Sequence, residues 1–156
     1  MKVFLIGCGD IARHHGRAVV RLGGQVIGGF DISQANADLV SQEFGCPCCG
    51  YEEIEENVVK ADYVVISTPP TKRLDYVEMV LKHHIPLYME KPVSATLEDA
   101  MKIKDMADQY DGKIMVGFAH YYRPLRNRKK RRMSHRHLLS ALSNLPDTGH
   151  RWSYHC

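Results

Sequence analysis

The sequence predicts an α/β protein in which a doubly wound parallel sheet is covered by helices on both faces. Short apolar runs alternate along the chain with segments whose apolar residues recur at helical spacing. The first run, residues 2–6, leads directly into a glycine-rich turn and a helix. A later run, residues 63–67, is continuous, which is typical of a parallel strand buried on both sides. Together these observations indicate the fold class.

The individual elements follow from apolar spacing and from residues that begin or end helices. Six strands are expected, over 2–6, the residues that end before Asp31, 46–50, 63–67, 86–89 and 113–117. Helices are expected over 11–22, 34–44, 51–60, 74–83 and 97–110. The helix over 34–44 is expected to bury Ala35, Leu39, Val40 and Phe44. Ser33 and Thr96 are expected as N-caps, and Gly45 and Gly112 as helix stops.

The turn after the first strand carries the G-x-G-x-x-[GA] pattern of dinucleotide-binding Rossmann domains. It reads Gly7-Cys8-Gly9-Asp10-Ile11-Ala12. Gly7 would permit the tight turn, Gly9 a close approach of the backbone to a pyrophosphate, and Ala12 close packing of the helix on the strand. Free N–H groups and the positive dipole at the helix start favour phosphate. We therefore predict that residues 7–12 bind a dinucleotide.

Asp31 follows the second strand, 22 positions after Gly9. A carboxylate at this position can accept hydrogen bonds from the adenosine ribose hydroxyls. It would also repel a 2′-phosphate, by roughly 4 kcal/mol for charges about 4 Å apart near a protein surface. The sequence therefore favours NAD over NADP as the cofactor.

The net charge of +3 combines two parts of opposite sign. Residues 1–122 contain 12 Lys and Arg against 17 Asp and Glu, whereas residues 123–156 contain 9 against 1. We expect an NAD-binding Rossmann domain over 1–122 and a basic tail, irregular or partly helical, over 123–156. The basic run 126–132 could contact phosphates of nucleic acid, but no aromatic residues or reading motif accompany it. Nucleic acid is therefore not favoured as a partner.

Five cysteines, an odd number and mostly clustered, are expected as reduced thiols rather than as a disulfide framework. The run Cys46-Pro47-Cys48-Cys49 could bind a soft metal, but no second Cys/His pair at zinc-finger spacing follows, so we expect no metal site. The chain starts with a strand rather than a leader segment, and no apolar run approaches the roughly 20 residues of a membrane span. We expect a cytoplasmic protein without a membrane partner.

Several motifs at expected strand ends resemble those of one dehydrogenase family. They are Thr68-Pro69-Pro70 and Glu90-Lys91-Pro92-Val93-Ser94, together with the glycine motif and His15. Over roughly residues 2–125 the chain is similar to the N-terminal half of the family of glucose-fructose oxidoreductase, inositol 2-dehydrogenase and the rhizopine-catabolism protein MocA (Gfo/Idh/MocA). The Glu-Lys-Pro motif is the most specific part of the resemblance.

The resemblance implies roles for residues at two strand ends. Lys91 matches a lysine beside the nicotinamide and the substrate hydroxyl, where its charge would stabilise a developing alkoxide. An alternative from the residues alone is a loop lysine in a salt bridge with Glu90. Glu90 itself matches an acid beside the cofactor, and Ser67, Thr68 and Pro69 match a loop that passes the dinucleotide. Where the family often has a histidine, this sequence has Arg73.

The family continues into a second domain with an open sheet, for which the roughly 30 residues after 125 are too few. The segment 147–150, Asp-Thr-Gly-His, is regarded as a coincidental match to that domain's Asp-x-Gly-x-His motif. We hypothesise that the tail arises from a reading-frame change or a truncated gene model, which the nucleotide sequence of the locus would decide.

Two functional hypotheses follow. The first is an NAD-dependent oxidoreductase that acts on a polyol, a sugar or a related hydroxyl compound. The alternative is a dinucleotide-binding module without catalysis, or an inactive fragment of such an enzyme. An apolar face left open where the second domain docks would favour self-association, so a homo-oligomer is also considered.

Overall fold

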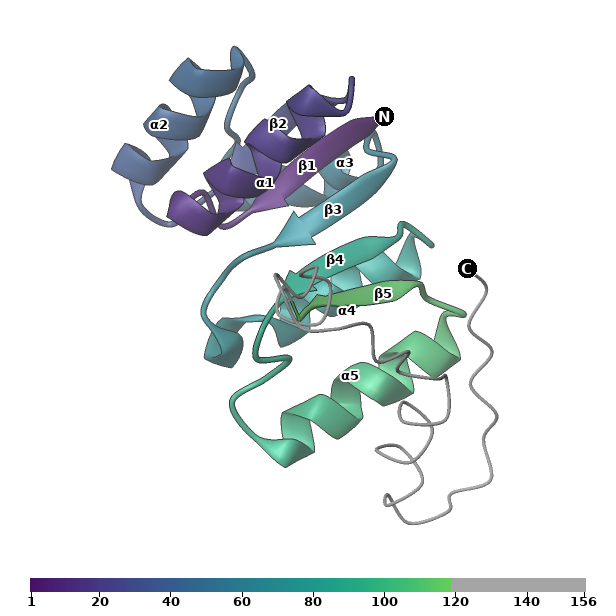
Figure 1. Ribbon diagram of the computed structural model, residues 1–156. Coiled ribbons are helices and arrows are strands. Elements are labelled where there is room, and N and C mark those ends of the chain that lie inside the picture. Colours follow the sequence, from purple (N-terminus) through teal and green to yellow (C-terminus); the bar gives the residue numbers. More distant parts are fainter. Residues whose placement is uncertain (119–156) are drawn as a thin grey trace, which may run out of the picture. The chain divides into compact units, whose positions relative to one another are not determined.

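The computed structural model describes residues 1–118, in which five parallel strands form one sheet with helices on both faces (Figure 1). The strands are β1 (Lys2–Ile6), β2 (Gln25–Phe30), β3 (Tyr63–Ile66), β4 (Leu87–Glu90) and β5 (Ile114–Gly117). The helices are α1 (Asp10–Arg21), α2 (Gln34–Phe44), α3 (Ile54–Val58), α4 (Leu74–Lys82) and α5 (Leu97–Gln109), with 3-10 turns η1 (Tyr51–Glu53) and η2 (Pro70–Lys72). The predicted doubly wound α/β fold is confirmed.

The strand order is β2-β1-β3-β4-β5, and all neighbouring strands are parallel. Ile6 pairs with Ile66, and Ile66 pairs with Met89, so the carboxyl ends of β1, β3 and β4 are level. The order reverses between β1 and β3, because β2 lies on one side of β1 and the later strands on the other. Open α/β sheets bind ligands outside the carboxyl ends of the strands at such a reversal.

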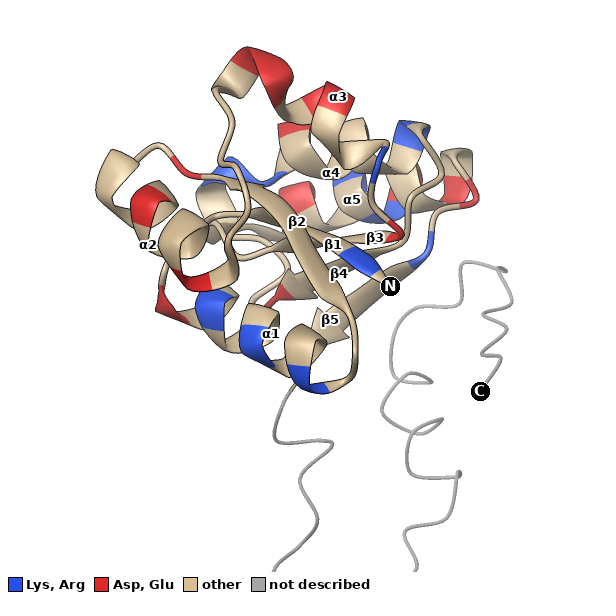
Figure 2. Ribbon diagram, turned by 90° about the horizontal axis from the view of Figure 1, so that it is seen from above, with Lys and Arg blue, Asp and Glu red and all other residues tan. Residues whose placement is uncertain are grey.

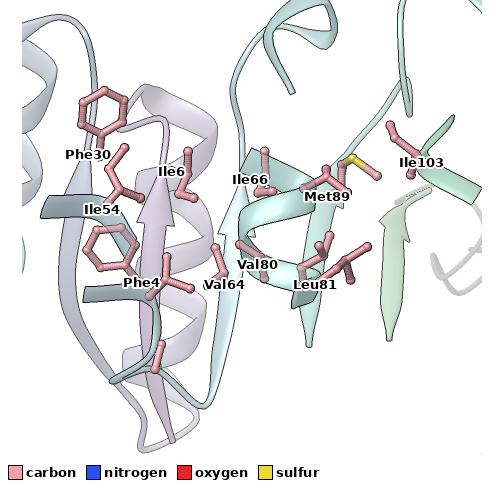
Figure 3. Close-up of a cluster of buried hydrophobic side chains, with 14 residues drawn as sticks. Phe4, Ile6, Phe30, Ile54, Val64, Ile66, Val80, Leu81, Met89 and Ile103 are labelled. Atoms are coloured by element: carbon pink, nitrogen blue, oxygen red, sulfur yellow. The ribbon is translucent and has the colours of Figure 1, made fainter. Parts of the chain in front are cut away.

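Successive side chains of the central strands enter two separate apolar cores. Phe4 and Ile6 of β1 belong to the larger core, which α3, α4 and α5 complete. Figure 3 shows this core, with Ile66 and Met89 from the sheet close to Val80 and Leu81 of α4. Val3 and Leu5 enter the second core, with residues of α1 and α2. Burial on both faces explains why β1 after Lys2, and β3, consist of apolar and aromatic residues.

The predicted strand over 46–50 is wrong, because this segment forms a single parallel bridge between Gly29 and Cys48. The N–H of Gly29 donates to the Pro47 carbonyl (3.3 Å), and the N–H of Cys49 donates to the Gly29 carbonyl (2.9 Å). Pro47 has no N–H for a ladder, and η1 starts directly after Gly50, so pairing stops. The described sheet therefore has five strands, and Cys48 lies beside β2, where the third strand of the classic Rossmann order 3-2-1-4-5-6 would pair.

The helices lie near their predicted positions, but some details differ. In α2, Ala35 and Leu39 are exposed, contrary to the prediction, and Ala37 and Val40 are buried. Thr96 caps α5 as predicted, since its hydroxyl accepts from the Asp99 N–H at 3.1 Å. Ser33 occupies the N-cap position of α2, but its side chain makes no capping hydrogen bond. After α5 the left-handed residue is Asp111 (φ 47°), not Gly112.

Charged residues among residues 1–118 belong mainly to the helices and loops around the sheet, as the coloured ribbon of Figure 2 shows. No helix in that range is long and apolar enough to cross a bilayer. The predictions for the tail over 123–156, including the basic run 126–132, fall outside the residues that the structure describes. The boundary at residue 122 therefore stays a prediction.

Candidate functional site

Most of the twelve predicted site residues come from the turns at the level carboxyl ends of β1, β3 and β4. They occupy residues 7–12, Asp31, residues 67–69 and residues 90–91. Cys8 and Ala12 are buried, Asp10 and Ile11 are exposed, and the Asp10 carboxylate pairs with Arg13. The structure thus brings together segments that are up to 84 positions apart in the sequence.

Gly7 and Gly9 meet different physical requirements. Gly7 has a positive φ of 87°, and a Cβ on it would lie 2.9 Å from both the Ser67 carbonyl carbon and the Thr68 nitrogen. Any side chain at position 7 would therefore push the turn after β3 away from β1. Gly9 has an ordinary φ of −67°, and a Cβ there would meet nothing within 4 Å. The space in front of Gly9 lies at the start of α1.

The start of α1 presents backbone donors to that space. Gly9 is the N-cap residue, and no side chain caps the helix. The first N–H groups of an α-helix have no partner within the helix, and the helix dipole adds positive potential there. This arrangement suits a phosphate group.

The Asp31 carboxylate is held by three donors. Its Oδ2 accepts from the Cys8 N–H (2.7 Å) and from the Asn36 side-chain amide (3.4 Å), and its Oδ1 accepts from the Ser33 N–H (2.8 Å). Since a carboxylate offers about four acceptor positions, one remains for a ligand hydroxyl. The spacing Asp-x-Ser, in which an acid accepts from the N–H two residues later, is a sequence signal for the Ser33 contact.

Two buried hydroxyl oxygens belong to the turn after β3, whose backbone lies beside Gly7. Ser67 Oγ and Thr68 Oγ1 are both without a hydrogen-bond partner among residues 1–118. Buried polar atoms in native proteins are nearly always hydrogen-bonded, so these hydroxyls indicate a polar ligand at this edge. Together with the donors of α1 and the free acceptor position of Asp31, they fit a dinucleotide.

Glu90, at the end of β4, makes three contacts through its carboxylate. Oε1 lies 2.9 Å from His15 Nε2 and 3.3 Å from the Tyr88 hydroxyl, which donates to it. Oε2 accepts from the Lys91 N–H at 3.2 Å. The Lys91 side chain is exposed, and its ammonium has no hydrogen bond or ion pair with any described residue. The salt bridge considered as the alternative for Lys91 is therefore absent from residues 1–118.

Arg73 has a structural role that the sequence did not predict. It is 2% exposed. Its Nε and Nη2 donate to the Thr68 carbonyl (2.9 and 2.7 Å), and its Nη1 donates to the carbonyls of Glu90 and Pro92. Burial lowers the pKa of the guanidinium, and the Glu90 charge opposes this effect. Arg73 thus joins the turns after β3 and β4. The sequence contains no signal for it, because a single arginine usually lies on the surface.

The cysteines pack around Gly29 below Asp31. A Cβ on Gly29 would lie 2.9 Å from Cys8 Sγ and 3.4 Å from Cys48 Sγ. Burial raises the pKa of the Cys46 thiol to about 11 and also raises the pKa of Cys8 and Cys48. No group of three metal-ligating side chains occurs in residues 1–118. Cys8 and Cys46 belong to the second apolar core, and Cys48 packs against it.

A parallel sheet with this reversal, a glycine-rich turn after β1 and an acid after β2 define the class of Rossmann-fold domains. A family model described as an oxidoreductase family with an NAD-binding Rossmann fold matches residues 1–118. The chain belongs to this Gfo/Idh/MocA family.

Individual relatives agree with this assignment. The chain is 28% identical over 122 residues to glucose-6-phosphate 3-dehydrogenase of Bacillus subtilis, and 31% identical over 129 residues to inositol 2-dehydrogenase of Burkholderia cenocepacia. Each alignment covers 78% of this chain but only 34% and 38% of the relative, so the chain spans about a third of their length. A D-xylose 1-dehydrogenase of Haloarcula marismortui, named for NADP⁺, is 30% identical over 51% of this chain and 23% of its own length.

A solved structure shows the same fold. It is an oxidoreductase from Agrobacterium radiobacter in complex with NAD⁺, L-tartaric acid and magnesium. It is 26% identical to this chain with a TM-score of 0.68, over 75% of this chain and 35% of that one.

Proposed function

We propose that this chain binds NAD at the carboxyl edge of its sheet, as the cofactor domain of an oxidoreductase that acts on a polyol, a sugar or a related hydroxyl compound. The observation that carries the proposal is the convergence at one edge of the open α1 start, the Asp31 carboxylate and the unpartnered hydroxyls of Ser67 and Thr68. A dinucleotide offers the phosphates, ribose hydroxyls and amide that these groups can bind.

Different residues would bind different parts of the cofactor. The N–H groups of residues 9–12, at the start of α1, would bind the pyrophosphate, and the absence of a side chain on Gly9 leaves room for it. Asp31 would bind the adenosine ribose. Residues 67–69 and Glu90 would contact the nicotinamide half of the cofactor, which would extend toward β4. Bound NAD would supply the hydride acceptor for oxidation of a hydroxyl carbon.

Lys91 is the residue we assign to the reacting oxygen. It follows β4, beside Glu90, and its ammonium has no partner among residues 1–118. A positive charge at the substrate hydroxyl would stabilise the negative charge that develops as the hydroxyl loses its proton. Lys91 thus binds and polarises the substrate oxygen.

Asp31 should decide both affinity and cofactor choice. Asp31→Ala is expected to weaken NADH binding about ten- to a hundredfold, because a charge-assisted hydrogen bond contributes about 1.5–3 kcal/mol. Asp31→Asn should reduce the preference for NADH over NADPH, since repulsion of the 2′-phosphate disappears. Titration of the full chain followed by nicotinamide fluorescence measures both effects. Asp105→Ala, an exposed position on α5, is the control. Saturable NADPH binding by the unmodified chain, equal to NADH binding, would contradict the assignment.

A second candidate is a dinucleotide-binding module without catalysis. The observation that favours it is the chain's span of about a third of its relatives' length. Assay of NAD reduction with a panel of polyols and sugars separates the two candidates. Turnover that falls at least about a hundredfold in Lys91→Ala is expected for the oxidoreductase. NADH binding without turnover in any member of the panel supports the module.

A further inference from the structure

The Glu90 carboxylate makes no ion pair with the Lys91 ammonium, although the two residues are adjacent. Both of its oxygens accept hydrogen bonds elsewhere, Oε1 from His15 and Tyr88 and Oε2 from the Lys91 backbone. We propose that His15 is a positioning residue that holds the Glu90 carboxylate against α1 and so keeps it from pairing with the Lys91 ammonium, which is left to the substrate oxygen. This inference rests on the proposed function for the role of Lys91.

The His15 contact is the shortest of the three and is well supported. The Nε2–Oε1 distance is 2.9 Å, and the side chains of His15 and Glu90 are 26% and 19% exposed. Because a carboxylate oxygen only accepts hydrogen bonds, Nε2 carries the hydrogen in this contact. The imidazole ring packs against the Tyr88 ring, with centroids 4.7 Å apart and planes at 58°. This packing fixes the direction in which Nε2 points.

The backbone on both sides of Lys91 is fixed by a different residue. Arg73 donates to the carbonyls of Glu90 and Pro92 from beneath the turn. Loss of the His15 contact would therefore leave the turn in place and free only the Glu90 side chain. A freed carboxylate next to a lysine ammonium would pair with it, and the substrate oxygen would then compete with an anion.

The test measures acylation of lysine amines in the full chain without cofactor. Trace acetic anhydride is added at fixed pH, and the peptide that contains Lys91 is quantified by mass spectrometry against that of Lys113, an exposed lysine that directly precedes β5. In His15→Phe, which keeps a ring beside Tyr88 but removes the donor, Lys91 should react about three- to tenfold more slowly, because a nearby anion favours the unreactive ammonium form. His15→Ala should behave in the same way.

Two further variants separate this role from a purely structural one. His15→Gln supplies an amide N–H in place of Nε2 and should restore the wild-type rate. His15→Phe combined with Glu90→Gln has no carboxylate to pair with Lys91 and should also return to the wild-type rate. If His15 only stabilises the turn, its loss should leave the reaction rate of the already exposed Lys91 unchanged or raise it.

An unchanged or faster reaction of Lys91 in both single variants, with Lys113 unchanged, would overturn the proposal. So would a slow reaction that persists when Glu90 is replaced by glutamine. Since the measurement contains neither cofactor nor substrate, its outcome is independent of the NADH titration. Failure of the His15 role and failure of the proposed function are therefore distinguishable.

Discussion

Gly7→Ala is expected to lower the free energy of unfolding by about 3 kcal/mol and to abolish NADH binding at accessible concentrations. Two costs add at this position. A non-glycine residue at φ 87° is strained, by about 1–3 kcal/mol. The new Cβ would also lie 2.9 Å from the backbone of Ser67 and Thr68, and overpacking of this kind costs about 1–3 kcal/mol. Urea unfolding followed by circular dichroism measures the stability change.

Gly9→Ala is the matched control, two residues away in the same turn. A Cβ at Gly9 meets no atom within 4 Å, and its φ of −67° suits alanine. The unfolding midpoint should therefore change little, whereas NADH binding should weaken because the methyl group occupies the space assigned to the pyrophosphate. Equal loss of stability in the two variants would refute the different roles given to the two glycines.

Arg73→Met is expected to destabilise the protein by about 3 kcal/mol. The carbonyls of Thr68, Glu90 and Pro92 would lose their charged donor, and a hydrogen bond to a charged group contributes about 1.5–3 kcal/mol. Relief of the buried guanidinium's desolvation offsets part of this cost. Because Arg73 joins the turns after β3 and β4, NADH affinity should fall as well. Chemical unfolding and NADH titration measure the two effects.

Two variants control this prediction. Arg73→Lys keeps the charge but lacks the planar fork of donors, so it should lie between wild type and Arg73→Met. Arg17→Met removes an exposed arginine that pairs with Glu43 on the surface and should leave the unfolding midpoint nearly unchanged. An Arg73→Met protein as stable as the Arg17→Met protein would show that the carbonyl contacts contribute nothing.

Most of the fold could be predicted because its central strands are buried on both faces. Residues 3–6 and 64–66 are all apolar, because both faces of these strands pack against helices. The strand predicted over 46–50 does not form, and the cause is local. The small residues and cysteines of this segment are typical of an edge strand. Pro47, however, has no N–H to extend the hydrogen-bond ladder, so only the Gly29–Cys48 bridge forms.

The candidate site likewise has a part that the sequence predicts and a part that it does not. The glycine motif and Asp31 lie within 25 residues of one another, so their spacing alone indicates a nucleotide site. The contacts that support the site join distant parts of the chain. His15 and Glu90 are separated by 75 positions, and the fit of Gly7 against Ser67 depends on the pairing of β1 with β3. No local pattern in the sequence carries such information, and a buried Arg73 runs against the usual exposure of arginine.

The central claim is that NAD binds at the carboxyl edge of β1, β3 and β4, and NMR of the ¹⁵N-labelled full chain tests it most directly. Addition of NADH should shift the backbone amide signals of residues 7–12, 31, 67–68 and 90–91, in saturable fashion and with one apparent affinity. Amides of α5, such as that of Asp105, should not move. A folded chain whose signals stay unchanged at millimolar NADH, or whose shifts gather on α5 and β5 instead, would contradict the account.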